Sequence, residues 1–181
     1  MTGHSGKDSA DVPDRLRPEV LAGKERDGDF LDRAASVFFR AVVDDVSDGG
    51  QTRTADAPAE RARRQRRKSP FFGGWDSLAG QWLRAAQPRS RTGVLTFVAV
   101  TGAHLRFVYL QKRRFSGKLG DAVEPGPSFR RGDLVWTRYV SGLGEVQFGF
   151  ADGSWGALSI HDEDDFAHLF PNTLSEKQPI P

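Results

Sequence analysis

The sequence predicts an α+β domain built on an antiparallel sheet, bent or closed into a small barrel, with a C-terminal amphipathic helix. Three observations support this fold class. Apolar residues alternate with polar ones in several short segments after residue 93, turn residues separate these segments, and one short helical pattern follows the last of them. A chain of 181 residues has room for one such domain with tails.

The N-terminal region lacks the pattern of a folded element. Residues 1–28 mix charges with Pro13, Pro18, Gly23 and Gly28, and their apolar residues follow no regular period. They predict a disordered, acidic and polar tail. The domain is expected to span residues 29–171, with a coil at 172–181 after it.

Residues 30–46 are compatible with two different elements. Apolar residues from Leu31 to Val42 recur at helical spacing, whereas those from Val37 to Val43 alternate as in a strand. The β-branched and aromatic residues of 36–43 favour a first strand, and the helix remains open.

Residues 47–70 predict a linker, because apart from proline they contain no apolar side chain larger than alanine. A basic segment in its second half carries six cations: Arg61, Arg63, Arg64, Arg66, Arg67 and Lys68. Phe71, Phe72 and Trp75 follow directly. Cations attract lipid or nucleic-acid phosphates, and adjacent aromatic rings insert at a bilayer interface or stack on bases. These are the candidate anion-binding and aromatic-contact residues, and a solvated loop with packed aromatic rings is the alternative.

A helix is predicted over residues 75–86. One helical face carries its apolar residues, which are Trp75, Leu78, Ala79, Trp82, Leu83 and Ala86. Asp76 or Ser77 can cap its start, and Pro88 lies just past its end.

After the helix the apolar period becomes two. The predicted strands are 94–100, 105–110, 134–140, 145–150 and 155–160. Residues 101–104 predict one hairpin turn and Asp152-Gly153 another. In the fourth of these strands Val146, Phe148 and Phe150 are expected to face the core, with Gln147 and Gly149 outward.

A short helix is expected to close the domain. Its first turn contains four acidic residues, 162–165, which the helix dipole favours. Phe166, Leu169 and Phe170 form its apolar face, and Pro171 ends it.

Two stretches carry a resemblance to a known family. Residues 93–108, GVLTFVAVTGAHLRFV, look like a hairpin of bacterial pleckstrin-homology-like (GRAM-like) domains. Residues 146–154 with 165–170 resemble the last hairpin and C-terminal helix of the same superfamily. The resemblance implies a PH-like scaffold that binds lipids, peptides or proteins. It transfers no binding residues, because the superfamily has no fixed set.

The net charge of +2 conceals a strong segregation along the chain. Residues 1–50 carry −4, residues 51–131 carry +12 and residues 132–181 carry −6. A second basic cluster lies in the positive region and comprises Lys112, Arg113, Arg114, Lys118, Arg130 and Arg131. Such a positive region predicts anionic partners.

Several functional classes have no support in the sequence. The chain has no cysteine, so disulfides, thiolate nucleophiles and cysteine zinc sites are excluded. His161 and His168 are spaced seven apart, which matches no metal-ligand motif, and no motif of a hydrolase, metalloprotease or phosphate loop occurs. We therefore expect a protein that is not an enzyme and has no cofactor, metal or catalytic residue. The 20 arginines against 6 lysines are typical of high-GC bacteria such as actinobacteria.

The expected function is that of a non-catalytic interaction module. Its basic segment would recruit it to an anionic surface, either lipid or an acidic protein. The alternative is a nucleic-acid-associated protein that uses the arginine-rich segment as a phosphate-binding arm. A third option is an autoinhibitory or dimerising contact between acidic and basic regions. Without an apolar leader or an apolar stretch of about 18 residues, a cytoplasmic location is expected, with peripheral association at the inner membrane face as an option.

Overall fold

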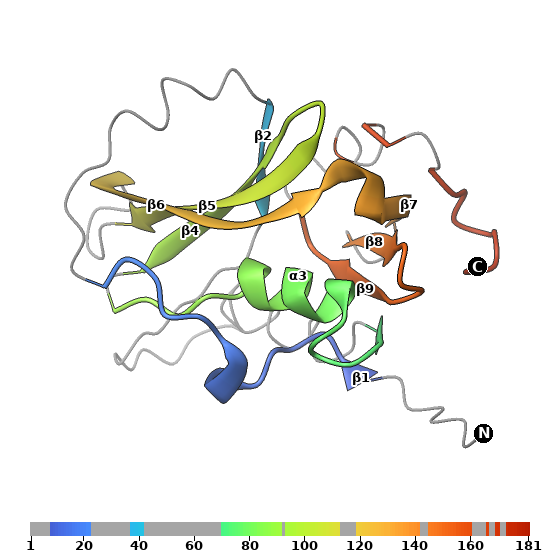
Figure 1. The fold of residues 1–181 in the computed structure, drawn as a ribbon, viewed down its shortest axis with the longest axis horizontal. Helices are drawn as coiled ribbons and strands as arrows, with labels where there is room; N and C mark the ends of the chain where they lie inside the picture. The colour runs from blue at the N-terminus through green and yellow to red at the C-terminus, as the bar shows by residue number, and fades with distance from the viewer. Residues whose placement is uncertain are drawn as a thin grey trace, which may run out of the picture.

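A computed structural model describes residues 8–22, 37–41, 70–91, 93–112, 119–141, 145–160, 166, 169–170 and 173–181. Within these residues, two antiparallel sheets pack around one α-helix (Figure 1). One sheet has the strand order β1-β3-β9-β8-β7 and the other β2-β4-β5-β6. The strands are β1 (Asp8–Ser9), β2 (Val37–Ala41), β3 (Pro70–Phe72), β4 (Val94–Val100), β5 (His104–Lys112), β6 (Leu119–Arg130), β7 (Leu134–Val140), β8 (Glu145–Phe150) and β9 (Trp155–Leu158). The α-helix is α3 (Leu78–Ala86), and two 3₁₀ turns are η1 (Asp14–Leu16) and η2 (Arg131–Asp133).

The predicted α+β class is confirmed, but the sheets of the described residues do not close into a barrel. The strand predictions for β4, β7 and β8 match the observed bounds, β5 begins one residue earlier and ends two residues later than predicted, and β9 ends two residues earlier. Of the two options for residues 30–46, a strand forms: β2 pairs with β4 from Val37↔Val100 to Ala41↔Thr96.

Trp82 of α3 joins the two sheets in one core. Its fully buried indole contacts Phe107 and Phe129 of the four-stranded sheet at ring-centroid distances of 4.7 and 5.2 Å. On the other side it contacts Phe148 and Phe150 of β8 at 5.7 and 5.9 Å. Because aromatic rings at such distances contribute beyond the area they bury, this one side chain couples both layers.

The α3 helix begins at Leu78, three residues later than the apolar pattern predicts. Ser77 is the N-cap, and its hydroxyl accepts a hydrogen bond from Gly80 N at 3.2 Å. The preceding turn packs closely on the helix, since a Cβ on Gly80 would lie 2.5 Å from Gly74 O. Trp75 therefore belongs to a turn and is only half-buried against the core.

The longest strand, β6, has no counterpart among the predicted strands. Its centre reads Glu124-Pro125-Gly126-Pro127, which is typical of a loop because proline donates no ladder hydrogen bond. The register against β5 shifts between Arg106 and Val108, so the prolines lie at a bulge. A Cβ on Gly126 would approach the Tyr109 ring to 2.7 Å, so glycine lets the bulge pack on β5.

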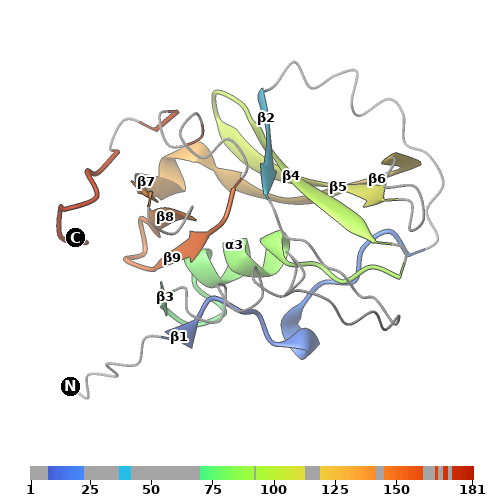
Figure 2. The same cartoon turned by 180° about the vertical axis from the view of Figure 1, so that it is seen from behind.

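The N-terminal segment, residues 8–22, differs from the expected disordered tail. Ala10, Val12, Val20 and Leu21 are buried in the main core. The segment runs beneath α3 from one end of the domain to the other, as both views show (Figures 1 and 2). These residues belong to the domain because their partners lie far along the chain, where local patterning cannot reveal them.

Side-chain and backbone hydrogen bonds attach this segment. The buried Gln87 accepts from Val12 N at 3.2 Å and donates to Ala10 O at 2.7 Å. Arg89 N donates to Pro18 O at 2.7 Å. Further along, Leu21 N donates to a carboxylate oxygen of Glu124 in β6 at 2.7 Å.

The strand β8 is buried along its whole length, so Gln147 and Gly149, which were expected to face outward, are covered by neighbouring side chains. Gln147 accepts from the buried guanidinium of Arg138 across the β7–β8 pair. Gly149 lies opposite Trp136, and a Cβ at this position would overlap the indole. Both residues pair with large neighbours that cover the outer face of the sheet.

The C-terminal residues 173–181 follow the open edge of β7, where a coil was expected. Thr173 forms a parallel bridge with Thr137, Leu174 N donates to Thr137 O at 2.7 Å, and Arg138 donates to Gln178 O. Of the predicted closing helix, only Phe166, Leu169 and Phe170 are described, and the two phenylalanines are buried. The rest of that helix lies outside the described residues.

Candidate cationic face and cavity

Most of the predicted anion-binding residues lie outside the part of the chain that the structure describes. These are Arg61, Arg63, Arg64, Arg66, Arg67, Lys68, Arg113 and Arg114. The remaining one, Lys112, is half-buried at the end of β5, where it pairs with Leu119.

The strand pairing divides the second predicted basic cluster. Arg130 lies opposite His104 at the start of β5, whereas Lys112 is the last residue of the same strand. Eight residues of extended strand place them roughly 27 Å apart. Arg131 has a structural role instead, because its guanidinium donates to Thr101 O and Leu169 O and lies 5.6 Å from the Phe170 ring centroid.

Two arginines and a histidine do come together, on the side of the four-stranded sheet that faces away from α3. His104 and Arg106 alternate along β5 with the buried Leu105 and Phe107, and Arg130 lies directly opposite His104. All three side chains are exposed. We call His104, Arg106 and Arg130 the cationic face. Alternation of polar residues with buried ones along β5 was visible in the sequence, but the contribution of Arg130 depends on the unpredicted strand β6.

The three predicted aromatic-contact residues have different environments. Phe71 is fully buried, with its ring 4.8 Å from that of Trp75, whereas Phe72 is 46% exposed. Phe72 ends a row across the outer face of the five-stranded sheet, in which Trp136 lies opposite Gly149, Gly149 opposite Trp155, and Trp155 opposite Phe72. Only Phe72 of the three therefore presents a largely exposed ring.

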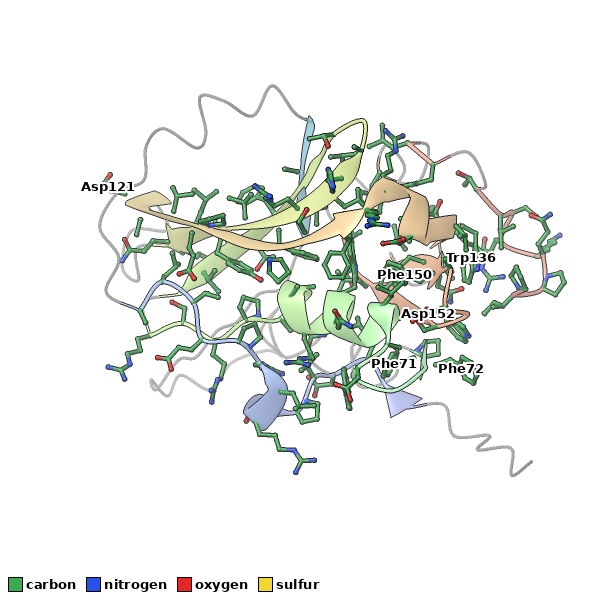
Figure 3. All side chains as sticks on the ribbon, viewed as in Figure 1. Phe71, Phe72, Asp121, Trp136, Phe150 and Asp152 are labelled. Carbon is green, nitrogen blue, oxygen red and sulfur yellow. The ribbon has the colours of Figure 1, made fainter. Side chains whose placement is uncertain are left out.

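These aromatic residues and the end of β5 that carries Lys112 lie far apart. Figure 3 places Phe71 and Phe72 at one end of the long axis and Asp121, two residues beyond Leu119, at the other. Phe72 and Lys112 consequently do not belong to one site.

A cavity of about 250 Å³ lies between α3, β6 and the N-terminal segment. Its lining comprises Pro18, Asp76, Gln81, Arg84, Ala85, Pro127 and Phe129. Gln81, Arg84 and Ala85 share one side of α3 because they are spaced three and four residues apart. Pro127 and Phe129 alternate along β6, so both reach the same space.

Arg84 is the cationic group of this cavity. It is half-buried, and its Nε donates to Leu16 O at 3.1 Å, which anchors the guanidinium against the N-terminal segment. None of the ion pairs among the described residues involves Arg84. Asp76 lies at the same cavity but is exposed.

Tyr109 holds one of the lining residues, Ala85, through a hydrogen bond. Its hydroxyl donates to Ala85 O at 2.9 Å. Burial, with a smaller contribution from the Glu124 charge, raises the pKa of Tyr109 far above its ordinary value. The phenol therefore stays protonated at neutral pH and holds the C-terminal half of α3 on β5.

Chemistry that needs a metal cluster has no support in the described ranges. No group of three histidine, aspartate or glutamate side chains in them could hold a metal ion. Among the helices that the structure describes, none combines the length and apolar character that crossing a bilayer requires. Comparison of the chain with family models, curated proteins and solved structures found no match.

Proposed function

We propose that this protein is a non-catalytic interaction module that binds an anionic surface, with a phospholipid membrane as its first partner. The cationic face carries the proposal. Its three exposed side chains lie on one side of the sheet, on β5 and β6, and both strands belong to the positive region of residues 51–131. Rigid strands keep cations in register without the entropic cost of ordering a loop.

Electrostatic attraction of this kind has a defined size and range. A lysine or arginine near an anionic membrane contributes about 1 kcal/mol, and the contribution falls off within about 10 Å at 0.1 M salt. Arg106 and Arg130 alone would give a weak interaction. The six cations of residues 61–68 supply the additional charge that stable recruitment needs.

The PH-like scaffold and its closing helix are part of this proposal. Antiparallel hairpins with a buried Phe166 and Phe170 after the last strand are what such a scaffold would contain. A scaffold of this type acts by binding.

A nucleic-acid groove would require the positive charge to continue across Arg89, Arg91 and Arg113, of which Arg113 lies outside the described residues. Arg91 instead lies 3.6 Å from Glu19, with the two side chains 89% and 47% exposed. This pairing reduces the positive charge there, so we favour the membrane surface.

The test is co-sedimentation of the full-length chain with phosphatidylserine-containing and with pure phosphatidylcholine vesicles at about physiological salt. The expected result is binding to the anionic vesicles alone, weakened about thirtyfold in R106Q/R130Q, which lacks two such charges. The matched control R89Q/R91Q removes the same charge at the other end of β4 and should bind as the parent does. Duplex DNA is added as competitor.

Two outcomes would contradict the proposal. Equal losses in both double variants would mean that the net charge, and not the cationic face, determines binding. If DNA displaces the protein from the vesicles and R89Q/R91Q weakens DNA binding, the protein binds nucleic acid and the membrane proposal is wrong.

A further inference from the structure

We propose that the cavity between α3, β6 and the N-terminal segment is a binding site for a small molecule with one planar apolar ring and one carboxylate. The cavity shares no residue with the cationic face, so this site is independent of membrane binding.

The walls of the cavity suit a ring. Phe129 and Ala85 are buried apolar residues, and Pro18 and Pro127 add two rigid apolar rings from opposite sides. A cavity of 150 Å³ lined by apolar side chains is large enough for benzene. About 250 Å³ therefore leaves space for a ring together with a small polar substituent.

The charge of the cavity selects an anion. Arg84 is half-buried and uses Nε for Leu16 O, and its two Nη groups have no hydrogen-bond partner among the described residues. Two parallel N–H donors match the two oxygens of a carboxylate. Asp76 is exposed and hydrated, so its charge acts through a higher dielectric than that of Arg84 and is screened more strongly.

The cavity is formed by features of the fold that have no other evident use. The bulge at Pro125–Pro127 bows β6, and bulges of this kind are common beside functional sites. The N-terminal segment forms the opposite wall, and Arg89 N fixes Pro18 through its carbonyl. Both walls are held in place without a ligand, which lowers the entropic cost of binding.

The experiment is a titration of the ¹⁵N-labelled full-length protein with sodium benzoate, followed by chemical-shift changes. We expect saturable binding with a dissociation constant on the order of 1 mM, because a ligand of this size has few atoms that contribute to the binding free energy. Shifts should concentrate at the backbone amides of residues 81–85 and 128–129. Three further probes are used. Benzyl alcohol lacks the carboxylate, benzylamine reverses the charge, and acetate lacks the ring.

Two variants test the roles of the residues. R84Q should weaken benzoate at least about tenfold, because it removes a charge-assisted hydrogen-bond pair. R91Q removes one exposed arginine outside the cavity and should bind benzoate as the parent does. A85L fills the cavity and should abolish binding. Thermal unfolding of each variant reports whether its fold is intact.

Several results would overturn the site. Non-saturable benzoate shifts would exclude it, as would equal affinity in the parent and in a folded R84Q. Tighter binding of benzylamine than of benzoate would show that Asp76, and not Arg84, determines the ligand charge. If A85L does not fold, the comparison of benzoate affinity between R84Q and R91Q still decides whether Arg84 binds the ligand.

Discussion

Asp152, at the tip of the β8–β9 hairpin, caps a helix that lies 74 residues earlier in the chain. Its carboxylate accepts from Leu78 N at 2.8 Å, while Ser154 Oγ accepts from the neighbouring Ala79 N at 3.0 Å. Together with Ser77, the hairpin satisfies the first three backbone donors of α3, which a helix cannot satisfy internally. The tip of the hairpin and the start of the helix therefore form one unit (Figure 3).

Replacing Asp152 by alanine should lower the free energy of unfolding by about 1 kcal/mol, the usual contribution of an N-terminal cap. Urea denaturation measures the change. The control D14A removes a carboxylate that is 82% exposed and should have little effect. Equal destabilisation by both variants would mean that the cap contributes nothing specific.

The stability that the Asp152 carboxylate contributes should depend on pH. Burial acts to raise the pKa of Asp152, but hydrogen bonds from the Ser154 hydroxyl and from the Leu78 and Ser154 amides outweigh it and lower the pKa below its ordinary value. The stabilisation is therefore complete above the unfolded-state pKa and is lost as the pH falls through the lower folded-state value. The stability difference between the parent and D152A should be constant near neutral pH and shrink in acid.

Trp82 should be the most sensitive position of the core. Trp82→Ala removes the ring that contacts both sheets and should cost about 3–5 kcal/mol of unfolding free energy. Trp75→Ala, at a half-buried turn position, should cost less. Chemical denaturation of the two variants ranks them, and a smaller effect at Trp82 would show that the sheets are held together by other contacts.

Gly149 and Trp136 form a cross-strand pair that tests packing on the outer face. Gly149→Ala should destabilise the protein by about 1–3 kcal/mol, because the new methyl group overlaps the indole. Gly102→Ala, where nothing lies within 4 Å of the added carbon, is the matched control. In the double variant W136A/G149A the cost of the methyl group should disappear. If the unfolding free-energy changes of Gly149→Ala and Trp136→Ala simply add in the double variant, the two residues do not interact.

The two buried hydrogen bonds of Gln87 indicate that the attached N-terminal segment stabilises the domain. Gln87→Ala leaves Val12 N and Ala10 O without their buried partner, which should cost about 1–3 kcal/mol. Gln81→Ala removes an exposed glutamine from α3, the helix that ends just before Gln87, and is the control. Amide hydrogen exchange should increase at residues 10–12 in Gln87→Ala. Unchanged protection would mean that this attachment is not needed.

The sequence by itself determined the fold class, most strands of the two hairpins, the position of α3 and the concentration of positive charge. These depend on local period, turn residues such as Asp152-Gly153 and capping residues such as Ser77, all of which act over a few residues. The strand β6 could not be predicted, because its prolines are tolerated only where the bulge against β5 removes the need for their missing donors.

Only the tertiary structure decided which side chains meet. It separated Lys112 from Arg130, joined Arg130 to His104 and Arg106, and buried Phe71 while leaving Phe72 exposed. It also turned residues 8–22 from an expected tail into a wall of the cavity. The physical reason is that these outcomes depend on pairing between segments far apart in the chain, and the free energy of such pairing is not encoded in any local pattern.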